Sequence, residues 1–332
     1  MKKALSLIWT AWQFECNRMQ EIQLGVSTLK SSRLAFGCWR VAGTGSPAEM
    51  TAQTRAAGYR AIIAAYEAGY TLFDNADIYA RGEAERVLGE TLKRVSGMRD
   101  RVLVATKCGI LPAGEPALES PQRYDFSAAH IIHSCEKSLT RLGLETIDIY
   151  LLHRPDYLAD PEEVGRAFSE LKAAGKVRWF GVSNFRPTLV TALQVACPMP
   201  FLVHQIEISL SQLAPFTDGT LDQCLIERLT PMAWSPLAGG LLGSGAKKLL
   251  LSQENYQPAK VLPVLDSIAK SRGTSRSCIA LAWLLKHPSN IQPIIGSTQP
   301  ERIREAAKAA DVDLTREEWY RLLNAARGEP LP

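Results

Sequence analysis

The chain has 332 residues, of which 46% are hydrophobic and 22% are charged. This is the composition of an ordinary globular protein, and it excludes intrinsic disorder and fibrous architectures. The formal net charge is only +4 and no long basic run occurs, so we expect no nucleic-acid partner. No apolar run approaches the roughly 20 residues of a membrane span, so we expect no membrane partner either.

Seven scattered cysteines without a Cys-x-x-Cys motif indicate reduced thiols in a cytoplasmic protein, because a disulfide framework or a zinc site needs a tighter pattern. The first residues resemble a signal peptide superficially, but their apolar stretch contains two tryptophans and no cleavage site of small residues follows it. We therefore expect residues 1–20 to be an extension outside the core and residues 21–332 to form one domain.

Beyond residue 30, short apolar runs alternate with longer amphipathic stretches. Eight runs are predicted to be strands, and several are almost wholly apolar, as parallel strands covered on both faces are. They are Leu34–Arg40, Thr71–Asp77, Val102–Cys108, Ile147–His153, Val177–Asn184, Val203–Ser209, Pro231–Leu237 and Gln292–Thr298. The predicted helices are Ala52–Ala68, Glu83–Arg94, Ala128–Leu142, Pro161–Ala174, Pro187–Ala196, Leu221–Arg228, Lys260–Arg272, Ser275–Lys286, Pro300–Ala309 and Thr315–Ala326.

Eight strands that are each followed by a helix predict a (β/α)8 TIM barrel in a single domain. A doubly wound sheet is less favoured, because no Gly-x-Gly-x-x-Gly turn follows the first strand. Two segments, Ile110–Phe126 and Ala238–Ala259, are longer than ordinary loops. Both follow strand C-termini, where barrels place their functional sites, so both are candidate lids.

Four side chains with useful chemistry follow or end successive strands: Asp74, Tyr79, Lys107 and His153. Each alone has a structural explanation, such as a turn-capping aspartate or a lysine that reaches the rim. Together they bring an acid, a phenol, an ammonium and an imidazole to one end of one barrel. A neighbouring lysine lowers the pKa of a phenol, and an aspartate keeps that lysine charged. These four side chains are therefore suited to donating a proton to a carbonyl oxygen.

These residues carry a resemblance. The stretches FGCWR, FDNADIYARGEAERVLGETL, VATKCG, IDIYLLHRPD, GKVRWFGVSNF, HQIEIS, MAWSPLAGG and PIIGSTQPERI follow one another between Leu34 and Ala326. In these stretches the chain resembles the aldo-keto reductase family, and within it the bacterial YdhF-like oxidoreductases. The resemblance implies NAD(P)H-dependent reduction of an aldehyde or ketone, with Tyr79 as general acid, Lys107 and Asp74 lowering its pKa, and His153 orienting the carbonyl.

The resemblance also implies a cofactor site across the mouth of the barrel. It assigns the nicotinamide carboxamide to Ser183, Asn184 and Gln205, the nicotinamide ring to Trp234, and the pyrophosphate to Ser235, Leu237, the segment Ala238–Gly245 and Arg40. It assigns the adenosine 2′-phosphate to Gly296, Ser297, Thr298 and Arg302, the adenine to Glu305, and part of the substrate pocket to Trp39. NADPH is the expected cofactor and NADH the alternative, because Gly296 and Ala306 replace the Lys and Asn of many relatives.

Alternatives remain at this stage. Some barrels of this kind act mainly as regulatory subunits that read the redox state of the nicotinamide, and an aldolase would use Lys107 as a Schiff-base amine. Arg81 follows the predicted catalytic tyrosine and either favours an anionic substrate or is a solvated loop residue. His130 and His133 share a helix face, but without a third ligand a packing role is favoured over a metal site. The substrate is a small carbonyl compound that the sequence does not identify further, nor does it indicate the oligomeric state.

Overall fold

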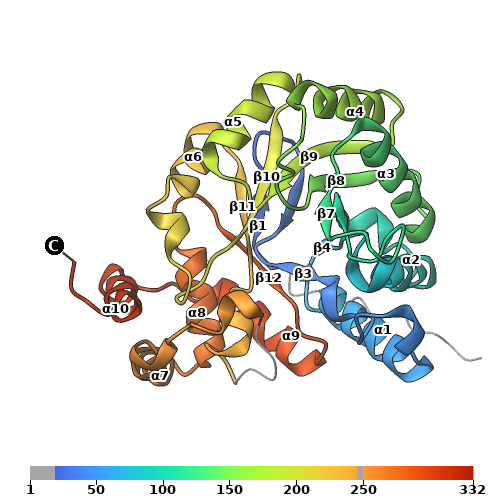
Figure 1. The fold of residues 1–332 in the computed structure, drawn as a ribbon. Coiled ribbons are helices and arrows are strands. Elements are labelled where there is room, and N and C mark those ends of the chain that lie inside the picture. The colour runs from blue at the N-terminus through green and yellow to red at the C-terminus, as the bar shows by residue number, and fades with distance from the viewer. Residues whose placement is uncertain (1–18, 245–249, 332) are drawn as a thin grey trace, which may run out of the picture.

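The structure is a computed structural model that describes residues 19–244 and 250–331. Eight parallel strands form a closed barrel, which confirms the predicted (β/α)8 fold in a single domain (Figure 1). In order around the barrel they are β10 (Phe201–Glu207), β11 (Thr230–Trp234), β12 (Gln292–Ile295), β3 (Ala35–Gly37), β4 (Leu72–Asp74), β5 (Leu103–Cys108), β8 (Ile147–Leu152) and β9 (Val177–Ser183).

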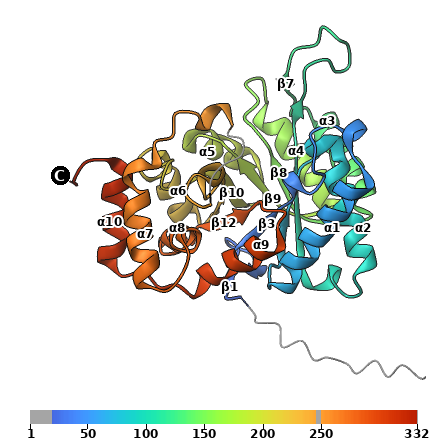
Figure 2. The ribbon, with the colours of Figure 1, turned by 90° about the horizontal axis from the view of Figure 1, so that it is seen from below.

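The helices surround the barrel as an outer layer (Figure 1). They are α1 (Ala52–Glu67), α2 (Glu83–Arg94), α3 (Ala128–Leu142), α4 (Pro161–Ala173), α5 (Pro187–Ala196), α6 (Thr220–Glu227), α7 (Leu262–Ser271), α8 (Arg276–Leu285), α9 (Pro300–Ala307) and α10 (Arg316–Arg327). Side chains cap the N-termini of α3 and α4, because the Ser127 side chain accepts from the His130 amide and the Asp160 side chain from the Glu162 amide. Helices α7 and α10 lie side by side at the edge of the molecule (Figures 1 and 2).

Several strands are shorter than predicted at the carboxyl end, where the site lies. Strand β3 ends at Gly37, and a 3-10 turn over Cys38–Arg40 follows; strand β4 ends at Asp74. The residues beyond β4 still contact the barrel, since the Asn75 amide donates to the Ala105 carbonyl at 2.8 Å. Apolar patterning therefore located each strand, while the chain turns outward at the rim earlier than the pattern suggested.

A hairpin that the sequence analysis missed closes the amino-terminal end of the barrel. Strands β1 (Glu21–Gln23) and β2 (Lys30–Ser32) pair antiparallel and connect through buried Leu24 and Leu29. These two leucines pack into the cluster of apolar side chains inside the barrel. Met19 is buried in the core, although it falls within residues 1–20, which were predicted to lie outside it; residues 1–18 of that segment lie outside the described residues.

The first predicted lid contains a second hairpin, formed by β6 (Ile110–Leu111) and β7 (Arg123–Tyr124). It projects from the end of the barrel opposite β1 (Figure 2). In the second predicted lid, residues 245–249 lie outside the described part, and 3-10 turns form at Ala238–Gly240, Leu251–Gln253 and Pro258–Lys260. Within the described ranges, no helix is long and apolar enough to cross a membrane.

Candidate active site

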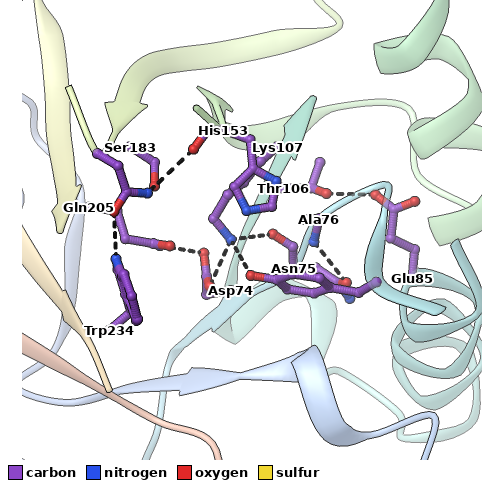
Figure 3. A network of polar contacts seen from close by, with 12 residues as sticks. Asp74, Asn75, Ala76, Glu85, Thr106, Lys107, His153, Ser183, Gln205 and Trp234 are labelled. Atoms are coloured by element: carbon purple, nitrogen blue, oxygen red, sulfur yellow. Dashed lines mark hydrogen bonds and ion pairs between the residues drawn. The ribbon is translucent and has the colours of Figure 1, made fainter. Parts of the chain in front are cut away.

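Lys107, Asp74 and Tyr79 form one hydrogen-bonded cluster at the carboxyl end of the barrel (Figure 3). The Lys107 Nζ lies 2.9 Å from Asp74 Oδ2, 2.6 Å from the Asn75 carbonyl oxygen and 3.2 Å from the Tyr79 hydroxyl. An ammonium has three N–H donors, so these three contacts use all of them. Lys107 and Asp74 come from neighbouring strands β5 and β4, and Tyr79 follows in the loop after β4.

The charges of this cluster follow from its burial. Burial lowers the pKa of Lys107, but Asp74 and Tyr79 raise it by more, so the group stays an ammonium at neutral pH. The sequence predicted an unusually acidic phenol, with Lys107 and Asp74 both lowering its pKa, and the structure contradicts this. Burial raises the pKa of Tyr79, Lys107 lowers it and Asp74 raises it, and the net direction is upward.

His153 follows β8 and faces the ring of Tyr79, with the two ring centroids 5.8 Å apart and nearly perpendicular at 77°. Burial, Lys107 and Arg154 hold the pKa of His153 well below its usual value, so the imidazole is neutral at neutral pH. Its Nδ1 atom is buried and has no hydrogen-bond partner among the described residues. A neutral imidazole beside the Tyr79 ring suits a hydrogen bond to a bound substrate.

Ser183, Gln205 and Trp234, which are predicted to bind the nicotinamide, lie beside this cluster (Figure 3), and hydrogen bonds join Asn184 to Ser183 and Trp234. The Trp234 Nε1 donates to Asn184 Oδ1 at 2.9 Å, and the Asn184 Nδ2 donates to Ser183 Oγ at 2.8 Å. Asn184 has a φ of 65°, a conformation that asparagine tolerates better than most residues. Gln205 Nε2 donates to Asp74 Oδ1 at 2.8 Å, a link between the two groups of residues that the sequence did not predict.

The donor set of these residues fits a carboxamide. Both ends of the Asn184 amide contact other protein groups, whereas Gln205 Oε1 accepts no hydrogen bond from the described residues. The Ser183 hydroxyl accepts from Asn184 and keeps its own hydrogen for donation. One free acceptor beside one free donor is the complement of a carboxamide, which offers an N–H and a carbonyl oxygen.

The residues predicted to bind the adenosine phosphate surround the first turn of α9. Gln299 at the N-cap makes no side-chain cap, so the amides of this turn are available to an anion. Arg302 is exposed in this turn, and Arg40 donates to the Gly296 carbonyl at 3.4 Å. Two guanidinium groups and uncapped amides fit a phosphate group.

The remaining predicted residues lie near the strand ends. Trp39 is 46% exposed, with the Arg40 guanidinium 4.8 Å from its ring centroid. Ser235 and Leu237 form the turn after β11, where Ser235 has a φ of 48°. Ser297 Oγ accepts from the Gln299 amide at 3.2 Å, Thr298 precedes α9, and Glu305 lies within α9. Gly245, the last residue of the predicted pyrophosphate segment, falls outside the described residues.

A polar network behind the tyrosine was missed by the sequence analysis. Glu85 is fully buried on α2 and accepts from Thr106 Oγ1 at 2.6 Å (Figure 3). It also pairs with Arg141 Nε at 2.5 Å. The signal was present, because Glu85 occupies the same helix face as the buried Leu88 and Leu92. A charged residue at an apolar position of a helix indicates a buried partner.

Asp77 borders this network and gives a prediction for stability. Burial and Glu85 raise its pKa to about 8, although Arg141 lowers it. The folded protein therefore holds a proton on Asp77 that the unfolded chain releases near pH 4. Stability from this group is present below pH 4 and is lost as the pH rises toward 8.

We expect Asp77→Asn to remove this loss. Between pH 5 and pH 8 the free energy of unfolding of the wild type should fall by about 3–4 kcal/mol relative to Asp77→Asn, as measured by urea denaturation. Asp100→Asn, which alters an exposed aspartate, is the control and should follow the wild type. Parallel pH profiles for the wild type and Asp77→Asn would contradict the assignment.

The structure bears on the roles that the sequence left open for Arg81, Lys107 and His130. Arg81 forms an ion pair with Glu115 of the β6–β7 hairpin segment, so its charge is already neutralised. The Schiff-base role of Lys107 is disfavoured, because its nitrogen is a fully hydrogen-bonded ammonium rather than a free amine. His130 contacts Ser134 on its own helix at 3.3 Å.

Comparison with known proteins shows the family. Residues 33–326 match the Aldo/keto reductase family. The chain is 40% identical to a 6-dehydroglucose reductase from Agrobacterium fabrum, with 94% of this chain and 99% of the relative covered, and 35% identical to oxidoreductase YdhF from Escherichia coli, with 95% and 100% covered. The solved structure of a glycerol dehydrogenase from Gluconobacter oxydans matches with a TM-score of 0.80 at 27% identity, covering 94% of this chain and 97% of that one.

The chain therefore belongs to the aldo/keto reductase family. It is an oxidoreductase of that family, as the resemblance to the YdhF-like proteins implied.

Proposed function

We propose that this protein is an NADPH-dependent reductase that converts an aldehyde or ketone to an alcohol, with Tyr79 as the general acid. One observation carries the proposal: the Tyr79 hydroxyl lies 3.2 Å from the Lys107 ammonium, in a cluster that Gln205 joins to the predicted nicotinamide residues. The same arrangement supports an enzyme over a protein that only binds the cofactor, because a binding role has no need of a proton donor.

The chain's own residues would divide the work as follows. A nicotinamide held by Ser183, Asn184, Gln205 and Trp234 would supply the hydride that reduces the carbonyl carbon. Tyr79 donates a proton to the carbonyl oxygen, which completes the alcohol and leaves a phenolate that later regains a proton from solvent. Lys107, held charged by Asp74, stabilises that phenolate through a hydrogen bond. His153, neutral at neutral pH, donates a hydrogen bond to the same carbonyl oxygen.

A phenol carries its proton at neutral pH, so the Tyr79 proton is present when the carbonyl arrives. Burial raises the pKa of Tyr79 and opposes proton release, whereas the adjacent Lys107 lowers it. The adjacent ammonium then favours the phenolate at the moment when the proton leaves. Gln205 and Lys107 both hydrogen-bond Asp74, so the carboxamide contacts and the proton donor share one rigid support.

The name of one relative supports a substrate class. The relative from Agrobacterium fabrum is named as a reductase of 6-dehydroglucose, an oxidised sugar, and the two chains match over nearly their whole lengths. We extend this to the present protein as a preference for small hydroxylated carbonyl compounds.

Steady-state oxidation of NADPH with a panel of aldehydes tests the proposal. An enzyme consumes many equivalents of NADPH per protein molecule, whereas a redox-reading regulatory subunit, the alternative considered above, consumes at most one. Turnover that stops after one equivalent with every aldehyde would favour the regulatory function.

Arg302 gives a separate prediction for the cofactor. We expect Arg302→Gln to raise the KM for NADPH about tenfold and to change the KM for NADH little, because a guanidinium hydrogen bond to the additional phosphate is lost. The matched control is Arg304→Gln on the same helix, since Arg304 is paired with Glu67 at 3.3 Å. Equal increases of both KM values in Arg302→Gln would contradict a contact with the 2′-phosphate.

A further inference from the structure

Arg154 lies at the mouth of the barrel and has no assigned role. It follows His153 directly, at the end of β8, and is half-buried. Its guanidinium carbon lies 5.5 Å from the ring centroid of Trp234, which ends β11 across the barrel. A planar guanidinium stacked on an indole keeps its N–H donors at its edge, where they remain available for hydrogen bonds.

Arg154 differs in its partners from two other arginines near the mouth of the barrel. Arg81 is paired with Glu115, and the Arg123 Nη1 donates to the Glu115 carbonyl at 2.6 Å. Within residues 19–244 and 250–331, Arg154 forms no ion pair and donates no hydrogen bond. An arginine that is held in place and has unused donors is suited to binding a ligand.

The charges around Arg154 indicate what kind of ligand fits. Glu207 ends β10 and is opposite Trp234 in the register of β10 and β11. Gln253 donates to Glu207 Oε1 at 2.7 Å, which fixes this carboxylate on the same side of the mouth. Burial raises the pKa of Glu207, and Arg154 is among the groups that lower it, so the two charges attract each other without direct contact.

A neutral, hydroxylated ligand fits the charges of Arg154 and Glu207 better than an anion does. A carboxylate or phosphate attracted by Arg154 would be repelled by Glu207, and Asp74 already neutralises Lys107 in the adjacent cluster. A hydroxyl group accepts from a guanidinium and donates to a carboxylate or to water. A substrate hydroxyl can therefore accept a hydrogen bond from Arg154, and no buried charge is left without a compensating group.

We propose that Arg154 is a specificity-determining residue, which donates hydrogen bonds to the hydroxyl groups next to the carbonyl of a polyhydroxylated aldehyde such as an open-chain sugar. The proposal rests on the function proposed above, in which Tyr79 and His153 bind the carbonyl oxygen. Since the Arg154 guanidinium lies over the ring of Trp234, beside the predicted nicotinamide residues, we assign to it the substituents on the carbons next to the carbonyl.

Two aldehydes of equal chain length, glyceraldehyde and propanal, test this inference. We expect the wild type to have the higher kcat/KM for glyceraldehyde, and Arg154→Met to lower that value about 10- to 100-fold, mainly through KM. The kcat/KM for propanal should fall much less, so the preference for glyceraldehyde over propanal is largely lost. Arg154→Lys should give an intermediate ratio, because an ammonium donates but lacks the planar fork. Hydration of glyceraldehyde in solution cancels in this comparison, since it is the same for each variant.

Arg81→Gln is the matched control, because Arg81 is also an arginine of the rim but is paired with Glu115; it should retain the wild-type ratio. Thermal unfolding verifies that each variant is folded. An unchanged ratio in a folded Arg154→Met variant overturns the inference while leaving the proposed function intact, and no reduction of any aldehyde by the wild type overturns the proposed function itself. If Arg154→Met lost activity toward succinic semialdehyde but not toward butanal, Arg154 would bind anionic substrates. If Arg154→Met bound NADPH more tightly than the wild type, the Arg154 side chain would occupy part of the cofactor site. Either result overturns the inference.

Discussion

Tyr79→Phe is expected to lower the turnover of carbonyl reduction by about 10²- to 10⁴-fold, the usual contribution of a positioned general acid. The substitution removes only the hydroxyl that lies 3.2 Å from the Lys107 ammonium and leaves the ring in place. The cofactor residues are on other strands, so the Kd for NADPH should change by less than about twofold. NADPH oxidation with glyceraldehyde measures the turnover, and quenching of tryptophan fluorescence measures the Kd.

Tyr150→Phe is the matched control for this experiment. Tyr150 is fully buried in β8, and its hydroxyl donates to the Ile131 carbonyl at 3.2 Å, outside the cluster of Lys107 and Asp74. We expect wild-type turnover and a stability loss of about 1 kcal/mol from the unpaired carbonyl. Reduction at the wild-type rate by Tyr79→Phe would show that another group delivers the proton.

The barrel was predictable because its strands are buried on both faces. Runs such as Val102–Cys108 and Ile147–His153 are apolar nearly throughout, and turn residues and helix caps bound the segments between them. Within β5, Lys107 interrupts an apolar run one residue before its end, which marked it as a group that needs a partner. The closeness of Lys107 and Tyr79 then followed from the barrel, since neighbouring parallel strands end on the same side.

Long-range contacts and burial were not predictable in the same way. The β1–β2 hairpin consists of three-residue strands, which are too short to show an alternating pattern. Gln205 hydrogen-bonds Asp74 from a strand 131 residues later in the chain, and no spacing rule in the sequence connects them. The pKa of Tyr79 was predicted in the wrong direction, because the sequence indicates its charged neighbours but not the water that the fold removes from around it.

Lys107→Met is expected to destabilise the protein by about 3–5 kcal/mol as well as to abolish turnover, because it leaves the carboxylate of Asp74 buried without its cation. The Gln205 amide still donates to Asp74, but a neutral donor compensates a buried charge less well than an ammonium does. Urea denaturation followed by circular dichroism measures the loss. The control is Lys286→Met: the partner of Lys286, Asp313, is 86% exposed, and loss of such a surface pair should leave stability nearly unchanged.

The double variant Lys107→Met/Asp74→Asn separates the two roles of the ion pair. Removing the second charge should restore about 2 kcal/mol of the lost stability, since no uncompensated carboxylate remains in the interior. Turnover should not return, because the ammonium that stabilises the Tyr79 phenolate is still missing. If the second substitution restored turnover along with stability, Lys107 would act only by holding the fold, and the electrostatic role assigned to it would be wrong. If it restored neither, Asp74 would not be the charge that makes the loss of Lys107 costly.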